Sequence, residues 1–192
     1  MIRLIDPAVH RSVPWKNGGG TATDYAVEYG GDGDVAWRIG TAEILKDGPF
    51  SDYSGVTRVF TIIHGPGVHL DFAGEGTRTL ARDEPTRFAG APAPFSRLRG
   101  GSATAFNLLM RDDAFQGDVA IRRGGGRPEA IAAGSPAEIL VIVAVEGTST
   151  VTDGAETATL APGWTAVISG GAGCLLAGPA DSRMAVVRLR PA

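Results

Sequence analysis

Residues 59–90 read VFTIIHGPGVHLDFAGEGTRTLARDEPTRFAG, and residues 139–170 read ILVIVAVEGTSTVTDGAETATLAPGWTAVISG. The two stretches align without a gap at a constant offset, so that Gly67 meets Gly147 (147 − 67 = 80). Several of the matched positions are turn glycines, which backbone geometry requires because glycine adopts positive φ angles without steric cost. The shared order of strand, turn, strand, turn and strand predicts two copies of one β-module.

The rest of the chain has the same character. Short segments rich in Val, Ile, Thr and Phe are each followed by a turn signal, such as the favoured hairpin dipeptide Asp153-Gly154. No window shows a convincing period of 3.6 residues, and Gly 28 and Pro 12 interrupt the chain too often for long helices. We therefore predict an all-β fold. Two similar antiparallel modules with an LAPGW step (160–164) indicate a bicupin, two tandem jelly-roll β-barrels that arose by internal duplication.

The repeat also predicts a division of the chain into domains. We expect an N-terminal cupin over residues 1–121, which carries the ligand pocket, and a degenerate C-terminal cupin module over residues 137–192. The stretch RRGGGRPEAIAAGSP (122–136) then forms a linker between them. A single RGG element is more simply interpreted as a solvated linker than as an RNA-binding segment.

Composition narrows the class of protein. A single cysteine, Cys174, excludes a disulfide framework and fits a reducing compartment. The longest apolar run (139–145) is too short to cross a bilayer, and the first residues lack the apolar run of a secretory signal. The formal net charge of −3 predicts no basic face for nucleic acid. We expect a cytoplasmic protein that binds neither membrane nor nucleic acid, and a homodimer is left open.

Histidine content argues against a metal centre. Metal-dependent cupins use two histidines on one strand, a glutamate and a third histidine, so that the alternating side chains meet at one ion. His64 and His69 flank the turn GPGV, and neither module contains a third histidine. We predict no metal and no other cofactor, and ordinary, partly exposed histidines at these positions.

Four ordered blocks in the N-terminal half resemble the HutD/Ves family: PWKNGGGTATDYA (14–26), WRIGTAEI (37–44), DGPFSDYSGVTR (47–58) and FNLLMR (106–111). Members of that family are bicupins, and several are encoded with histidine-utilisation genes. The resemblance implies a protein that binds a small anionic ligand and modulates histidine catabolism, with no established catalytic reaction.

This chain departs from the family pattern at three places. Thr23 stands where arginine is usual, Tyr53-Ser54 where Phe-Pro is usual, and His64 where glutamate is usual. The first departure would remove a charge from the ligand site.

The glycine run Gly18–Gly20 has two interpretations. Exposed backbone N–H groups in such a run could hold an anion, because glycine lets the backbone approach a ligand closely. The alternative is a tight connection between the first strand and the roll, with Trp15 packed in the core. A Walker loop is excluded, since no Gly-Lys-Ser/Thr follows the glycines.

Arg38 lies in the alternating stretch VAWRIGTAEI (35–44) and points away from Trp37. If it faces the barrel interior, it needs a carboxylate partner, either Glu43 or Asp24 or a ligand. A surface ion pair of small energetic value is the alternative for Arg38 and equally for Arg111. The buried amide expected at Asn107 could serve a backbone group or a ligand.

We expect the ligand-binding residues to converge on one pocket in the N-terminal roll. They are Lys16, Asn17, Gly18, Gly19, Gly20, Thr21, Asp24, Arg38, Phe50, Ser51, Asn107 and Arg111.

No catalytic residue is predicted, because Cys174 has no nearby histidine or basic residue and no serine lies in a G-x-S-x-G elbow. The predicted function is non-catalytic binding of N-formylglutamate, urocanate or a similar carboxylate. An alternative is a metal-independent isomerase or lyase that uses Asp24, Lys16 or His64 for proton transfer. A third interpretation makes the second roll an oligomerisation or scaffold module.

Overall fold

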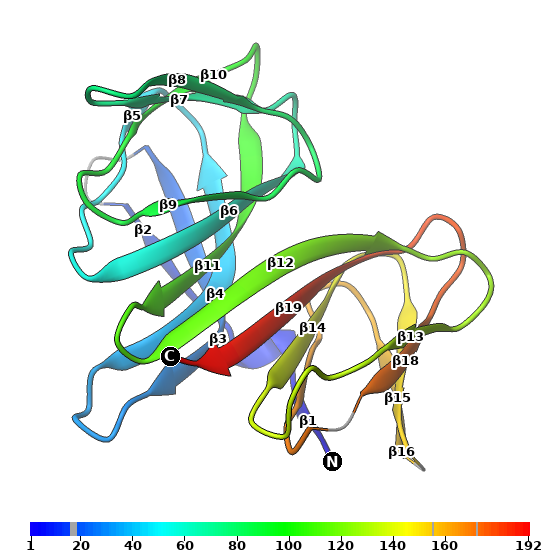
Figure 1. Ribbon diagram of the computed structural model, residues 1–192. Coiled ribbons are helices and arrows are strands. Elements are labelled where there is room, and N and C mark those ends of the chain that lie inside the picture. Colours follow the sequence, from blue (N-terminus) through cyan, green and yellow to red (C-terminus); the bar gives the residue numbers. More distant parts are fainter. Residues whose placement is uncertain (16–18, 155, 172) are drawn as a thin grey trace. The chain divides into compact units, whose positions relative to one another are not determined.

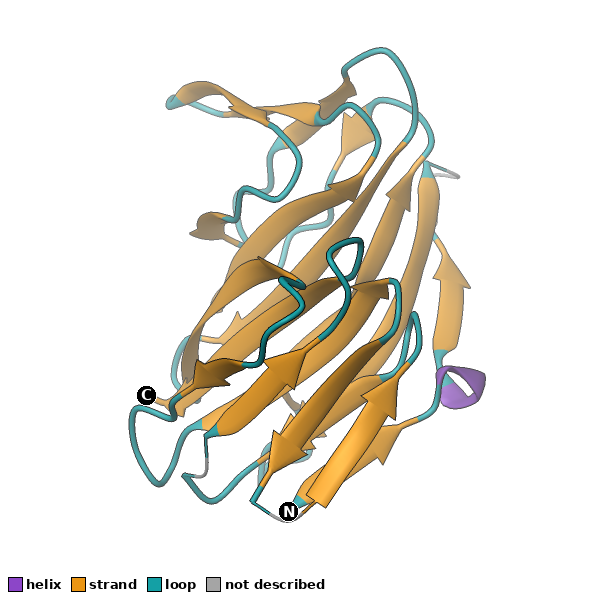
Figure 2. Ribbon diagram, turned by 90° about the vertical axis from the view of Figure 1, so that its right-hand side faces the viewer, coloured by secondary structure: helices purple, strands orange, loops and turns teal. Residues whose placement is uncertain are grey.

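A computed structural model of the chain describes residues 1–15, 19–154, 156–171 and 173–192. Internal contacts divide the chain into two compact units: the continuous segment His10–Phe115, here the N-terminal unit, and Met1–Val9 together with Gln116–Ala192, here the C-terminal unit. Strands connected by turns make up both units, and among the described residues the one helical element is a 3-10 turn at Pro7–Val9 (Figure 2). The all-β prediction is confirmed.

Two antiparallel sheets form the N-terminal unit. The larger sheet contains, in spatial order, β2 (Arg11–Pro14), β3 (Gly20–Tyr29), β4 (Val35–Ile44), β11 (Ala103–Arg111), β6 (Val56–His64) and β9 (Thr86–Ala89). The smaller sheet contains β5 (Gly48–Pro49), β10 (Phe95–Leu98), β7 (Val68–Phe72) and β8 (Gly76–Leu80).

Two antiparallel sheets also form the C-terminal unit. The larger sheet contains β1 (Ile2–Ile5), β17 (Thr165–Ile168), β14 (Ile139–Glu146), β19 (Arg183–Pro191) and β12 (Phe115–Arg123), and Figure 1 shows β14, β19 and β12 side by side. The smaller sheet contains β13 (Glu129–Ile131), β18 (Cys174–Ala177), β15 (Ser149–Asp153) and β16 (Glu156–Leu160).

The strand orders of the two units match. The order β4-β11-β6-β9 in the N-terminal unit corresponds to β12-β19-β14-β17 in the C-terminal unit, and β5-β10-β7-β8 corresponds to β13-β18-β15-β16. The turn glycines agree as well, since Gly67 and Gly147 both have positive φ angles, of 103° and 67°. Residues 59–90 and 139–170 therefore share one strand succession, as the repeat predicts, and the molecule is a bicupin of two jelly rolls.

The unit boundaries differ from the predicted domains. The first strand, β1, belongs to the C-terminal unit because it pairs with β17, with Ile2 opposite Ile168. The predicted linker (122–136) contains β13, which pairs with β18. Strand β12 likewise belongs to the C-terminal sheet. Residues 1–9 and 116–136 thus belong to the C-terminal unit, whereas the sequence predicts them in the N-terminal cupin and the linker. Periodicity identifies a short strand but does not indicate which sheet edge the strand joins.

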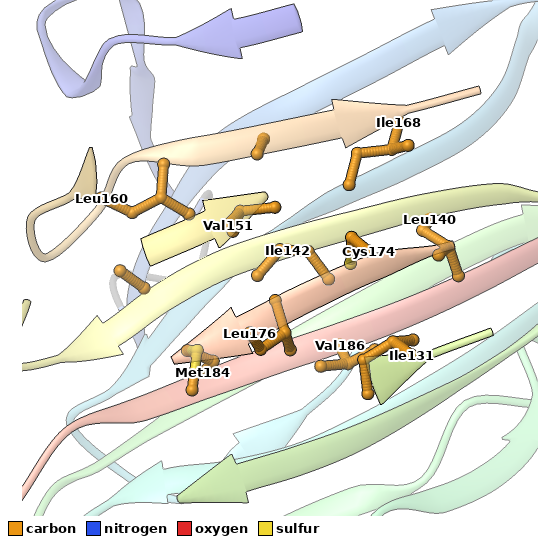
Figure 3. Packing of buried hydrophobic residues seen from close by; sticks show 12 residues of the cluster. Ile131, Leu140, Ile142, Val151, Leu160, Ile168, Cys174, Leu176, Met184 and Val186 are labelled. Atoms are coloured by element: carbon orange, nitrogen blue, oxygen red, sulfur yellow. The ribbon is translucent and has the colours of Figure 1, made fainter. Parts of the chain in front are cut away.

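Each unit has its own apolar core between its two sheets. The C-terminal core is aliphatic, and its labelled side chains point toward one another from facing strands (Figure 3). The N-terminal core is richer in phenyl rings, which come from Phe50, Phe60 and Phe88. Within the described residues, no helix is long and apolar enough to cross a membrane.

Candidate ligand-binding site

A cavity of about 570 Å³ lies within the N-terminal unit. Strands β3, β4 and β11 of the larger sheet form one wall, and the segment from β5 to the start of β6 contributes much of the rest. Its polar lining residues are Asp24, Arg38, Thr41, Ser51, Tyr53, Arg58 and Asn107.

Strand alternation explains which side chains reach the cavity. Successive side chains of a strand point to opposite faces of the sheet, so residues two apart share a face. Asp24, Gly40 and Asn107 lie in one row across β3, β4 and β11. Any side chain at Gly40 would meet the carbonyl oxygen of Thr23 at 2.2 Å, so glycine is required there for the close approach of β3.

A neighbouring row places two arginines on either side of β11. Leu109 pairs with Arg38 on β4 and with Arg58 on β6, so both guanidinium groups come from strands that flank the same residue. All three residues line the cavity.

Arg58 is the most unusual group in the cavity. Its side chain is only 6% exposed, and its Nε and Nη1 atoms have no hydrogen-bond partner among the described residues. Its guanidinium carbon lies 4.9 Å from the ring centre of Phe50, 5.5 Å from that of Phe88 and 5.9 Å from that of Tyr53. The pKa of Arg58 is lowered to about 10, mainly by burial; the effect of Tyr53 opposes this shift, and the charge of Arg38 adds to it. Arg58 is therefore still charged at neutral pH.

Arg38 has a partner from the chain. Its Nε atom lies 3.5 Å from Oδ1 of Asp24, and both side chains are partly exposed. The sequence left Glu43, Asp24 and a ligand open as partners of Arg38, and in the structure Asp24 is its partner. Its guanidinium carbon is also 5.9 Å from the ring centre of Tyr53, so one ring contacts both cavity arginines.

Asn107 adds an unsatisfied acceptor. The residue is 9% exposed, and its side-chain Oδ1 has no hydrogen-bond partner within the part of the chain that the structure describes. Phe50 and Ser51 also line the cavity, and Phe50 packs between Trp15 and Phe60 at ring distances of 6.2 and 5.3 Å. The structure thus brings together five of the predicted site residues, namely Asp24, Arg38, Phe50, Ser51 and Asn107.

Arg111 does not join them, and its predicted convergence on the pocket is wrong. Its Nε atom donates to Asp113 and its Nη1 atom to Asp32, each at 2.6 Å. The hydrogen bonds that Arg111 donates to Asp113 and Asp32 raise its pKa. The residue is the last of β11, beyond the cavity row at Leu109, and it meets acids from two nearby turns. Arg111 instead forms surface ion pairs, which is the alternative that the sequence left open for it.

The glycine run is described only in part, because Lys16, Asn17 and Gly18 lie outside the described residues. The carbonyl of Gly19 accepts a hydrogen bond from the N–H of Leu45 at 2.9 Å. A side chain at Gly20 would collide with the carbonyl of Glu43. Gly19 and Gly20 therefore connect and pack β3 against β4.

Two threonines of β3 also lie away from the cavity. Thr21 and Thr23 are not among the residues that line it. The hydroxyl of Thr23 lies 2.8 Å from that of Ser12. The departure at Thr23 therefore removes no charge from this cavity, contrary to the expectation from sequence.

Sequence reasoning missed Arg58, although a signal was present. The stretch VTRVFTII (56–63) places one charged residue in an otherwise apolar strand, two residues before the buried Phe60. Alternation alone puts Arg58 on the same face as Phe60 and Ile62, which belong to the core.

The three histidines and the cysteine are not among the residues that line the cavity. His69 Nδ1 is 2.9 Å from the hydroxyl of Thr79, His64 is exposed at the end of β6, and His10 stacks on Tyr25. Among the described residues, no group of three or more His, Cys, Asp or Glu side chains could hold a metal ion. Cys174 is buried, and this burial raises its pKa to about 11, so the thiol is protonated at neutral pH.

The fold and the cavity define the class: a bicupin with an arginine-containing cavity in its N-terminal roll. The family model for HutD matches residues 8–186, and the chain belongs to the HutD family, the cupin family associated above with histidine utilisation. The resemblance inferred from the four sequence blocks is confirmed.

Two relatives are similar in sequence to part of this chain. The chain is 31% identical over 116 residues to an uncharacterized 21.2 kDa protein in the hutC 3′ region of Pseudomonas putida, covering 60% of this chain and 61% of that protein. It is 32% identical over 108 residues to protein Ves of Citrobacter koseri, covering 56% of each. The matches thus span a little over half the length of these curated relatives.

Solved structures show the same fold over nearly the whole chain. HutD from Pseudomonas fluorescens SBW25, in a formate condition, has 24% identity, a TM-score of 0.82 and full coverage of both chains. A conserved protein of unknown function from Pseudomonas aeruginosa PAO1 has 21% identity and a TM-score of 0.87, with 99% of each chain covered. A bacterial pirin from Escherichia coli in complex with nickel(II) has 13% identity, a TM-score of 0.70 and full coverage of both chains.

Proposed function

We propose that the N-terminal unit binds a small carboxylate, such as N-formylglutamate or urocanate, without transforming it, and that the protein modulates histidine catabolism through this binding. The observation that carries the proposal is Arg58, a buried charged guanidinium on the cavity wall with two nitrogens that lack a partner among the described residues.

The energetics favour an external anion. Moving a charged side chain from water into the protein interior costs roughly several kcal/mol, even after the surrounding groups have relaxed. Contacts with aromatic faces return about 0.5–2 kcal/mol each, and Arg58 has three such rings. A ligand carboxylate offers more, because an arginine can bind both of its oxygens through two parallel hydrogen bonds.

The cavity also has the size and polarity expected of such a site. Its volume of about 570 Å³ lies within the range of small-molecule pockets. Asn107 and Ser51 supply polar groups beside Arg58, and the Arg38–Asp24 pair supplies one cation and one anion. A ligand with a second polar group is therefore accommodated better than formate or acetate alone.

Two features support binding rather than catalysis. The described residues that line the cavity include no histidine, cysteine or lysine. The acid among them, Asp24, is engaged with Arg38. Membership of the HutD family supports the link to histidine catabolism.

Calorimetric titration tests the proposal. Wild type is titrated with N-formylglutamate, urocanate and glutamate, with formate as the smallest carboxylate probe. We expect at least one of the larger acids to bind, and Arg58→Met to lose roughly 2–5 kcal/mol of binding free energy, as truncation of one partner of a buried charge pair does.

Arg111→Met is the matched control, because that arginine is satisfied by Asp32 and Asp113 away from the cavity. It should bind as wild type does. Proton NMR of the same mixtures should show the acids unchanged after prolonged incubation. Equal affinity in wild type and Arg58→Met, or no binding of any acid, contradicts the proposal, and turnover would favour the isomerase or lyase alternative.

A further inference from the structure

The C-terminal unit holds a buried carboxylate that is bound from several sides. Glu138 is 1% exposed and accepts a hydrogen bond from Arg188 Nη1 at 2.8 Å and another from the backbone N–H of Gly134. Arg190 Nη2 lies 3.6 Å from the same carboxylate oxygen that Arg188 contacts. Two cations and one backbone donor thus surround one carboxylate.

This carboxylate occupies the place that corresponds to the cavity. Phe60 and Leu140 are aligned by the repeat, so Arg58 and Glu138, each two residues earlier, are equivalent. Asn107 pairs with Phe60 across the strands, and Arg188 pairs with Leu140 in the same way. Glu138 and Arg188 therefore lie at the barrel end that forms the cavity in the N-terminal unit.

The segment before β14 supplies further contacts around Glu138 and Arg188. Arg188 Nη1 also donates to the carbonyl of Ala132 at 2.7 Å, which ties the segment to β19. A side chain at Gly134 would come within 2.6 Å of a carboxylate oxygen of Glu138, so a larger residue would displace that oxygen. The donors are therefore arranged around the carboxylate by the local fold.

We infer that the C-terminal unit contains a second carboxylate-binding site, which the chain's own Glu138 occupies and which accepts acetate or formate when that side chain is removed. Beyond its Cβ atom, glutamate consists of one methylene group and a carboxylate, so acetate replaces the atoms that Glu138→Ala deletes. Wild type should consequently bind at most one free carboxylate per chain, in the N-terminal unit.

Thermal melting with added acetate tests the inference. The variants carry Arg58→Met as a common background, which silences the N-terminal cavity and keeps this test independent of the proposed function. In that background Glu138→Ala should melt roughly 10 °C lower, because the arginines and the Gly134 N–H lose their acceptor. Acetate or formate should restore most of this loss in a saturable way, because a ligand that binds only the folded state stabilises it.

Two controls separate a specific site from general salt effects. Sodium chloride at equal ionic strength should not restore the loss, and Glu138→Gln should not respond to acetate because its amide still fills the site. If Glu138→Ala does not fold alone, refolding yield in acetate against chloride gives the same comparison. Equal responses to chloride and acetate, an equal acetate shift with and without Glu138→Ala, or failure to refold in either salt would overturn the inference.

Discussion

At equivalent positions the two units of this protein bury opposite charges. The N-terminal unit buries Arg58 with two nitrogens unpaired among the described residues, whereas the C-terminal unit buries Glu138 between Arg188 and Arg190. The backbone framework is shared, so the difference comes from side chains. The same framework thus carries an internal ion pair in one copy and, in the other, a buried arginine with two nitrogens that lack a partner among the described residues.

The cores differ in the same direction. Phe60 and Phe88 of the N-terminal core correspond by the repeat to Leu140 and Ile168 of the C-terminal core. Mostly aliphatic side chains lie together in the C-terminal core (Figure 3). Phenyl rings instead present flat faces to the guanidinium of Arg58. The N-terminal unit therefore offers Arg58 aromatic contacts where the C-terminal unit supplies Glu138 with arginine partners.

The largest effect among the following variants is expected in the C-terminal unit. Glu138→Gln should lower the free energy of unfolding at neutral pH by about 2 kcal/mol, because hydrogen bonds between charged groups are lost while the shape is kept. Urea denaturation measures the change. An unchanged midpoint would mean that Arg188 and Arg190 do not stabilise this unit through Glu138.

The same variant has a predicted pH dependence. Burial raises the pKa of Glu138, but the hydrogen bonds from Arg188 and Gly134 and the charge of Arg190 outweigh it and hold the pKa below its ordinary value. A lowered pKa gives stability that is present above about pH 4, the unfolded value, and is lost as the pH falls through the folded value. The stability difference between wild type and Glu138→Gln should therefore shrink below about pH 4.

A smaller change in stability, of opposite sign, is expected in the N-terminal unit. Arg58→Met removes a buried charge and keeps an apolar side chain of similar length, so it should raise the stability of the ligand-free protein by about 1 kcal/mol. Chemical denaturation without ligand measures this change. A clear loss of stability would mean that Arg58 is structural and that its aromatic neighbours satisfy it.

The smallest effect is expected from metal removal. Treatment with phenanthroline followed by desalting should leave both stability and carboxylate binding unchanged. Elemental analysis that finds about one iron, zinc or manganese per chain, lost together in a His64→Ala, His69→Ala double variant, would contradict this prediction.

The fold was predictable because its signals are local. Alternation and turn glycines each act within about ten residues, and together with the repeat at an offset of 80 residues they correctly predicted the duplicated jelly rolls. The site was harder, since the choice between Arg58 and Arg111 depends on which arginine meets an acid in space. Asp32, which satisfies Arg111, is 79 residues away in the chain. Periodicity contains no information on such a contact.

The strand pairing of β1 has a consequence for how the protein is made. The N-terminal unit is one continuous stretch, and it can fold on the ribosome while the remainder of the chain is still being translated. Strand β1 is translated before the N-terminal unit, yet its partner β17 emerges about 160 residues later. During that interval its hydrogen-bonding edge has no native partner, so β1 joins its sheet only after the whole N-terminal unit has been translated.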